Sequence, residues 1–332
     1  MSKVKDTAYL ALTAMLRARE AKMLDRDRMD RMLNAASYAD AAKLLVDCGY
    51  EDMSGLDAKM LDAVLGARKE AIFEEVYRMS PEKEMVDIFR LRYDYHNAKV
   101  VIKSAGAGVN GGHLFSDVGR VSGEKIAEAC AEDRFSGLPV ALAKAIREAK
   151  VMLAKTGNPQ MADFILDRAY FAEMTELAKK QGDSFLMGYV KVMIDAANLR
   201  TAVRTVRMNK GQDFLLQALI AGGNVSPDKL AQAAVSADGL AALFTATVLY
   251  NAAVSGLEAM KGGSMTKFEL ACDNAVTAYL AKAKLISFGC QPVVKYLALV
   301  EADITAIRMV LSGKMAGIAP NVIRERLRDL DA

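Results

Sequence analysis

The segment Asp94-Tyr95-His96-Asn97-Ala98-Lys99 has two counterparts further along the chain. It returns as Asp195-Ala196-Ala197-Asn198-Leu199-Arg200 and, more faintly, as Asp303-Ile304-Thr305-Ala306-Ile307-Arg308. The spacings are 101 and 108 residues. Such a period indicates that one structural unit of about 110 residues occurs three times. We therefore expect three related units, over residues 1–120, 121–224 and 225–332.

A second echo follows each copy of the motif. It reads Val121-Ser122-Gly123-Glu124-Lys125-Ile126, then Val225-Ser226-Pro227-Asp228-Lys229-Leu230, then Ile318-Ala319-Pro320-Asn321-Val322-Ile323. Asp167 and Asp273 lie 28 and 30 residues before the second and third motif aspartates. The order of these features is kept, so each unit is expected to contain several helices.

The repeated aspartate has a structural interpretation. On an α-helix, Asp94 and Asn97 share a face that continues into apolar residues, and Asp195 with Asn198 repeats this arrangement. A carboxylate at the edge of an apolar stripe is costly unless it is paired or hydrogen-bonded. We therefore predict that Asp94, Asp195 and Asp303 make a fixed helix-to-helix contact in every unit and are not catalytic.

Composition favours an all-α fold. Of the 332 residues, 52% are apolar and 26% charged, with 6 prolines, 19 methionines and no tryptophan. Because proline breaks helix interiors and central strands, so few prolines favour long uninterrupted helices. Four prolines are expected at the first position of a helix, namely Pro81, Pro159, Pro227 and Pro320. Thr266 and Glu269 have the spacing of a capping box, and no segment has a convincing strand pattern.

Charge and cysteine usage indicate a cytoplasmic protein. The 44 basic and 41 acidic residues give a net charge of +3, which does not favour nucleic acid or anionic lipid as a default partner. The four cysteines contain no C-x-x-C pair, so reduced thiols are expected. The first residues lack the apolar core of a secretory signal.

Residues 239–257 contain no charged side chain, and this run approaches the length of a membrane span. Many of these residues are alanine, threonine or asparagine, which favour insertion less than leucine or phenylalanine. We expect a buried central helix, apolar on all sides, with a transmembrane helix as the alternative.

Catalytic, cofactor and metal sites are not expected. The glycine spacing at residues 106–111 matches a dinucleotide-binding fingerprint, but a helical segment precedes it where that motif needs a strand. No phosphate-binding G-x-x-x-x-G-K-[ST] loop occurs, and the only histidines are His96 and His113. The acidic residues 25, 27 and 30 alternate with arginines, as on a solvated helix face.

Basic residues gather on two helical faces. Lys99, Arg200 and Arg308 follow the motif aspartates by five residues. Lys99 and Arg200 could face a neighbouring unit or solvent.

Basic residues are concentrated near the N-terminus and in the second unit, although the chain as a whole is nearly neutral. Five arginines from these two regions are candidates for docking an acidic partner: Arg17, Arg19, Arg200, Arg204 and Arg207.

Together these motifs resemble the C subunit of prokaryotic V-type (archaeal-type) ATPases and ATP synthases, the counterpart of the d subunit of eukaryotic V-ATPases. The resemblance covers nearly the whole chain. It is carried by Leu16 to Leu24, by the motifs at 94–99 and 195–200, by Leu219-Ile220-Ala221-Gly222-Gly223, and by Tyr296-Leu297 through Asp303, Arg308 and Gly317. Ala306 departs from the asparagine of the first two copies.

The resemblance implies a funnel or socket of helices with pseudo-threefold symmetry. It implies a non-catalytic rotor part, present in one copy, that joins a shaft of D and F subunits to the membrane ring of proteolipids at the cytoplasmic face. Torque would pass through it to a ring that moves H+ or Na+. It implies no cofactor, no direct nucleotide binding and no nucleic acid. The alternatives are a cytoplasmic helical-repeat scaffold, favoured by linear stacking of the units, an all-α enzyme with a deep pocket, and an integral membrane protein.

Overall fold

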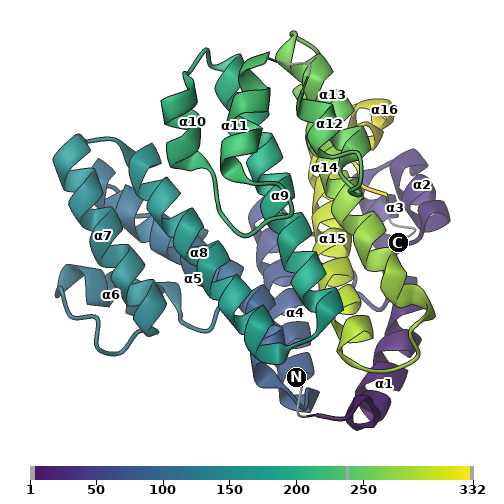
Figure 1. The fold of residues 1–332 in the computed structure, drawn as a ribbon. Helices are drawn as coiled ribbons and strands as arrows, with labels where there is room; N and C mark the ends of the chain where they lie inside the picture. Colours follow the sequence, from purple (N-terminus) through teal and green to yellow (C-terminus); the bar gives the residue numbers. More distant parts are fainter. Residues whose placement is uncertain (1–3, 237–238, 330–332) are drawn as a thin grey trace.

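Three long helices organise the molecule, and each carries one copy of the repeated motif (Figure 1). They are α5 (Lys83–Ala107), α9 (Ser184–Arg207) and α15 (Cys290–Met315). The computed structural model describes residues 4–236 and 239–329 and contains no β-strand among them, so the all-α prediction is confirmed. The outermost residues of the first and third predicted units, 1–3 and 330–332, lie outside the described part.

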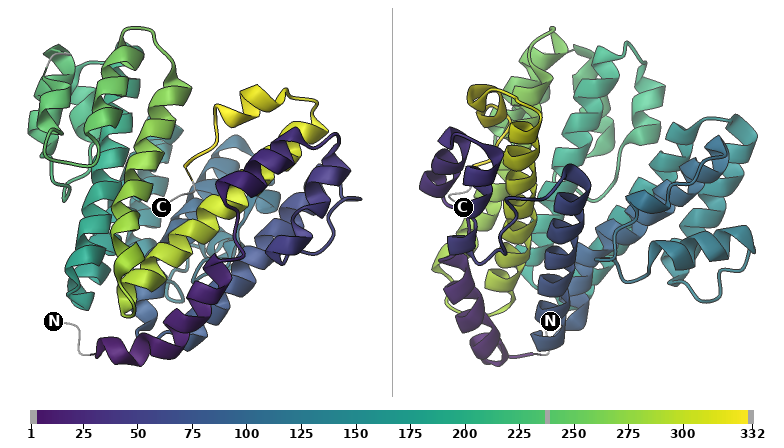
Figure 2. Two further views of the ribbon diagram at one scale, coloured as in Figure 1. Left: turned by 90° about the vertical axis from the view of Figure 1, so that its right-hand side faces the viewer. Right: turned by 180° about the vertical axis from the view of Figure 1, so that it is seen from behind.

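The long helices meet at their N-terminal ends and diverge toward their C-terminal ends (Figures 1 and 2). Where they meet, Gln291 at the start of α15 donates a hydrogen bond to Asp183, the residue before α9, with an Nε2–Oδ2 distance of 2.8 Å. The rings of Phe89 in α5 and Tyr189 in α9 stack with centroids 5.6 Å apart. We call this region, around Lys83, Ser184 and Cys290, the narrow end.

Each long helix is flanked by a second helix. Helix α8 (Pro159–Gln181) lies along α5, α14 (Met265–Leu280) lies along α9, and α4 (Ala58–Met79) lies along α15. Shorter helices pack outside: α6 (Gly123–Ala131) against α5, and α11 (Pro227–Ser236) against α9. Next to α15, the same place is taken by helices from the start of the chain, with α3 (Tyr38–Lys43) against α15 and α2 (Arg26–Asn34) against α3.

The remaining helical elements are η1 (Asp6–Tyr9), α1 (Leu10–Glu20), η2 (Val46–Cys48), η3 (Gly112–Leu114), α7 (Val140–Thr156), α10 (Gln212–Ala218), α12 (Leu240–Leu243), α13 (Tyr250–Met260), η4 (Ala281–Leu285) and α16 (Pro320–Arg324). Of these, α7 packs along α8 and α13 packs against α9 and α14, while most of the others are short. One apolar core runs through most of the chain, and a second, over residues 196–275, lies between α9, α11, α13 and α14.

The prediction of one central helix over residues 239–257, buried on all sides, is wrong. The segment forms α12 and most of α13, joined by turns. It is buried in part, because Leu240, Phe244 and Leu249 are fully covered in the second core. Tyr250 and Val254 are exposed, and the hydroxyls of Thr245 and Thr247 bond to the carbonyl oxygens of Ala242 and Phe244. Threonine hydroxyls that bond locally to backbone carbonyls compete with helix formation. No helix within the described ranges is long and apolar enough to span a membrane.

Three of the four proline-marked helix starts are confirmed, since α8, α11 and α16 begin at Pro159, Pro227 and Pro320. Pro81 is an exception because it lies two residues before α5. The capping-box prediction is also wrong. Ser264 is the N-cap of α14, and its hydroxyl accepts from Lys267 N at 3.2 Å, so Thr266 lies inside the helix.

Candidate functional site: the polar contacts of the long helices

Asp94 is completely buried in α5 and receives three hydrogen bonds. Its Oδ1 accepts from the backbone N–H groups of Arg120, at 2.7 Å, and Val121, at 3.1 Å, and its Oδ2 accepts from Arg120 Nε at 2.7 Å. One turn later, Asn97 exchanges two hydrogen bonds of 2.9 Å with the backbone of Ser116. The two motif residues thus fix the segment that leads into α6.

Asp195 and Asn198 do the same for the segment before α11. Asp195 Oδ2 accepts from the backbone N–H of Asn224 at 3.0 Å and from its Nδ2 at 2.8 Å, and Oδ1 accepts from Val225 N at 3.1 Å. Asn198 bonds to both N and O of Ile220, at 2.9 and 2.7 Å. The expected helix-to-helix contact is therefore a contact from a helix to the loop before a short helix.

Asp303 takes its partners from the beginning of the chain. Its Oδ1 accepts from Leu24 N and its Oδ2 from the hydroxyl of Tyr50, both at 2.9 Å. Leu24 precedes Asp25, the N-cap of α2, as Val121 precedes the N-cap of α6. The N-terminal segment, and not the echo at 318–323, completes the third copy. Ala306 has no side-chain amide and cannot make the hydrogen bonds of Asn97 and Asn198. The hydroxyl of Tyr50 donates a hydrogen bond to Asp303 in addition to the one from Leu24 N.

Burial changes the acidity of all three aspartates. Desolvation raises the pKa of Asp94, Asp195 and Asp303, while the donors that they accept from oppose the shift. The group that lowers the pKa most is Arg120 for Asp94, the backbone N–H of Val225 for Asp195 and the backbone N–H of Leu24 for Asp303. A buried carboxylate with several directed donors restricts how the connecting segment can lie.

The basic residue of each motif pairs with an aspartate on the flanking helix. Lys99 Nζ lies 2.6 Å from Asp167 of α8, Arg200 Nη2 lies 2.5 Å from Asp273 of α14, and Arg308 Nε lies 2.6 Å from Asp62 of α4. These pairs link α5 to α8, α9 to α14, and α15 back to α4. Asp62 was missed at the sequence level, although it lies 32 residues before Asp94, much as Asp167 and Asp273 precede their motifs.

The five candidate docking arginines all make contacts inside the chain. Arg17 pairs with Glu20 and Arg19 with Glu75, each at 2.7 Å. Arg200 and Arg204 both contact Glu269 of α14, and Arg207 donates to the carbonyl oxygen of Gly263 at 2.8 Å. These contacts hold helices together, and a role in docking stays a prediction.

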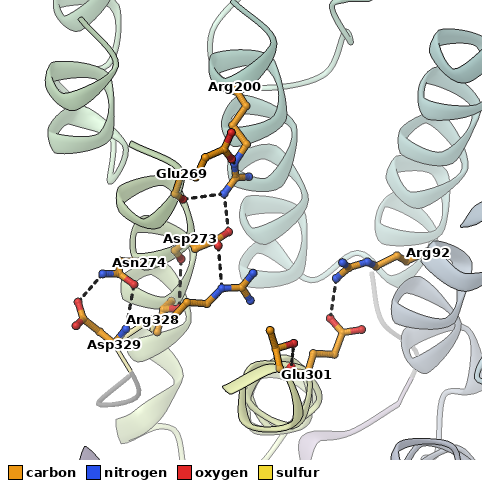
Figure 3. Close-up of polar contacts among 10 residues, drawn as sticks. Arg92, Arg200, Glu269, Asp273, Asn274, Glu301, Arg328 and Asp329 are labelled. Atoms are coloured by element: carbon orange, nitrogen blue, oxygen red, sulfur yellow. Dashed lines mark hydrogen bonds and ion pairs between the residues drawn. The ribbon is translucent and has the colours of Figure 1, made fainter. Parts of the chain in front are cut away.

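A second polar cluster faces the space between the long helices (Figure 3). Glu301 of α15 accepts from the hydroxyl of Tyr93 at 2.5 Å and lies 3.4 Å from Arg92 of α5. The Arg92 side chain is 60% exposed, so this space is open to solvent. Figure 3 also shows Arg328 bonded to Asp273, which receives Arg200 as well. Arg92 and Glu301 were missed because the second copy has Met193 at the same position.

The histidines and the glycine-rich stretch singled out in the sequence have structural surroundings. Within residues 4–236 and 239–329, no three His, Cys, Asp or Glu side chains come together as metal ligands. His96 is exposed and its Nε2 lies 2.9 Å from the carbonyl oxygen of Leu114, while the glycines at 106–111 end helix α5. A cavity of about 760 Å³ lies beside them, and its lining is mostly apolar.

Comparisons with known proteins agree over nearly the full length. A model of the ATP synthase (C/AC39) subunit family matches residues 12–326. The C subunit of the V-type sodium ATPase of Enterococcus hirae is 24% identical over 324 residues, covering 97% of this chain and 98% of the relative. The C subunit of the A-type ATP synthase of Methanocaldococcus jannaschii is 22% identical, covering 97% of this chain and 86% of the relative.

Proposed function

Because the chain belongs to the ATP synthase (C/AC39) subunit family, as the resemblance of its motifs predicts, we propose that it is a central-stalk rotor component of a rotary V-type ATPase or ATP synthase. It is non-catalytic. It transmits torque between a shaft of D and F subunits and the proteolipid ring, which moves H+ or Na+ across the membrane. It is peripheral, at the cytoplasmic face, and binds neither nucleotide nor nucleic acid.

Contacts between the third unit and the first support the proposal. The third motif bonds to Leu24 and pairs with Asp62, both near the start of the chain. A repeat protein that stacks linearly has a free first and last unit. Here the contacts run from α5 to α8, from α9 to α14 and from α15 to α4, as expected for three units around an axis.

We accordingly assign the molecule a funnel shape with pseudo-threefold symmetry. The units at 1–120, 121–224 and 225–332 are its three sectors, with residues of the first sector completing the third. The long helices, which meet at the narrow end and diverge from it, line the funnel. The open end accepts the shaft, and the narrow end faces the ring. Close-packed helices are stiff, as a torque transmitter requires.

The alternative is a cytoplasmic all-α scaffold without a rotary role. Closed contacts are less suited to that role than an extended array, which offers a long concave surface.

Affinity purification of the tagged chain from membranes tests the proposal. We expect the shaft subunits and the ring proteolipid to remain attached, and cross-linking to place the shaft at the open end. Recovery of the chain without either partner would overturn the rotary role and favour the scaffold.

A further inference from the structure

The end of η4 and the turn that follows it, residues 283–289, form a loop that exposes two large apolar side chains at the narrow end. Leu285 is 93% exposed and Phe288 is 38% exposed. Burying a leucine side chain is favourable, so one that stands almost fully in water on an ordered loop is a candidate contact residue. Figure 1 shows this loop beside α1, near the starts of α9 and α15.

Arg17 holds the loop in place. Its Nη2 lies within hydrogen-bond distance of three carbonyl oxygens, those of Ala283 at 3.1 Å, Lys284 at 3.2 Å and Ile286 at 2.9 Å. Glu20 orients Arg17 and also lies 3.6 Å from the buried Lys295 of α15. The loop is thus anchored to both α1 and α15. A preorganised loop loses little conformational freedom when it binds.

Two lysines flank the apolar residues. Lys282 and Lys284 are exposed, and neither forms an ion pair with any residue in the described part of the chain. Lys282 instead lies over the ring of Tyr279, with its Nζ 4.6 Å from the ring centroid. An apolar tip beside two such cations is complementary to an apolar recess with carboxylates at its rim.

We propose that Leu285 and Phe288 insert into such an acid-rimmed apolar recess on a membrane-embedded protein partner. This inference rests on the proposed function, which places the narrow end toward the ring. A protein recess is favoured over the lipid surface for a physical reason. Stable membrane anchoring needs a long acyl chain together with a second signal, whereas two side chains and two lysines provide much less.

Sedimentation binding with the full-length chain tests the inference. The two probes are membranes of the source organism washed free of peripheral subunits, and protein-free vesicles of lipids extracted from the same membranes. We expect Leu285→Ser to raise the Kd for washed membranes at least about tenfold without lowering the melting temperature, because its side chain is 93% exposed. Phe288→Ala should raise the same Kd. Val140→Ser is the matched control, because Val140 is 86% exposed at the start of α7 and should leave the Kd unchanged.

The contribution of the two lysines is measured by the salt dependence of binding. The double change Lys282→Gln and Lys284→Gln should weaken binding at low ionic strength and flatten its salt dependence. A loss of binding with Val140→Ser equal to that with Leu285→Ser would overturn the inference.

The possible failures differ in what they exclude. Wild-type affinity of Leu285→Ser for washed membranes would overturn the loop inference and leave the proposed function intact. Equal wild-type binding to vesicles and to membranes would assign the loop to lipid and overturn the protein recess. Absence of wild-type binding to membranes would contradict the proposed function as well.

Discussion

Replacing Asp195 by alanine should destabilise the chain in a way that can be estimated from its bonds. Three donors lose their acceptor, namely the backbone N–H groups of Asn224 and Val225 and the Nδ2 of Asn224. Leaving a buried donor unsatisfied costs about 1–3 kcal/mol. Val225 is buried and Asn224 is exposed, so one full penalty and part of a second apply. Relief from burying the carboxylate offsets some of this cost. We expect a net loss of about 2–4 kcal/mol.

The assay is urea unfolding of Asp195→Ala beside the wild type, together with a thermal scan. For a chain of this length, about 3 kcal/mol corresponds to a melting temperature lower by about 4 °C. Asp117→Ala is the control, because Asp117 is exposed in the loop before α6. A wild-type midpoint for Asp195→Ala would refute the reasoning that the buried aspartate fixes the segment before α11.

Three further predictions concern the same contacts. Gly223→Ala should lower the free energy of unfolding by more than about 2 kcal/mol, because a Cβ there would lie 2.1 Å from Oδ1 of Asp195. Gly66→Ala is the control, because a Cβ at Gly66 would meet no atom within 4 Å. Equal melting temperatures for the two variants would contradict the close approach at Gly223. Burial raises the pKa of Asp195 above its unfolded value, so its contribution to stability is full below that value and is lost as pH rises through the folded pKa. The wild type should therefore lose stability relative to Asp195→Asn as pH rises from about 4, and a flat difference in urea midpoints would contradict this. Arg200→Ala should lower the free energy of unfolding by about 1–2 kcal/mol, because the Arg200 side chain is 21% exposed and contacts two carboxylates. Arg308→Ala should lower it by less than about 1 kcal/mol, because the Arg308 side chain is 41% exposed. A larger loss for Arg308→Ala in urea unfolding would contradict this reasoning.

The sequence predicts much of the architecture because the motif lies on the longest helices. The scarcity of proline and the recurrence of Asp94, Asp195 and Asp303 correctly indicate an all-α fold with buried polar positions in related places. A comparison of the repeats along the chain did not show that the third unit contacts the first. The echo at 318–323 follows Asp303 along the chain, but the backbone hydrogen bond to Asp303 comes from Leu24, which is 279 residues away.

Two other errors have physical causes. The lack of charge at 239–257 reflects many alanines and threonines, which can remain at a surface, so charge alone did not establish burial. The pair of Arg92 and Glu301 left no repeated signal. Arg92 is 60% exposed, and positions that face open space need not repeat the chemistry that buried packing requires.

Coupling between shaft and ring can be measured by comparing ATP hydrolysis with ATP-driven ion uptake in membrane vesicles from a strain that lacks this chain. We expect hydrolysis by the catalytic head to persist while ion uptake is lost, and the purified chain to restore uptake when it is added back. Ion uptake at the wild-type rate without the chain would contradict the proposed coupling between shaft and ring.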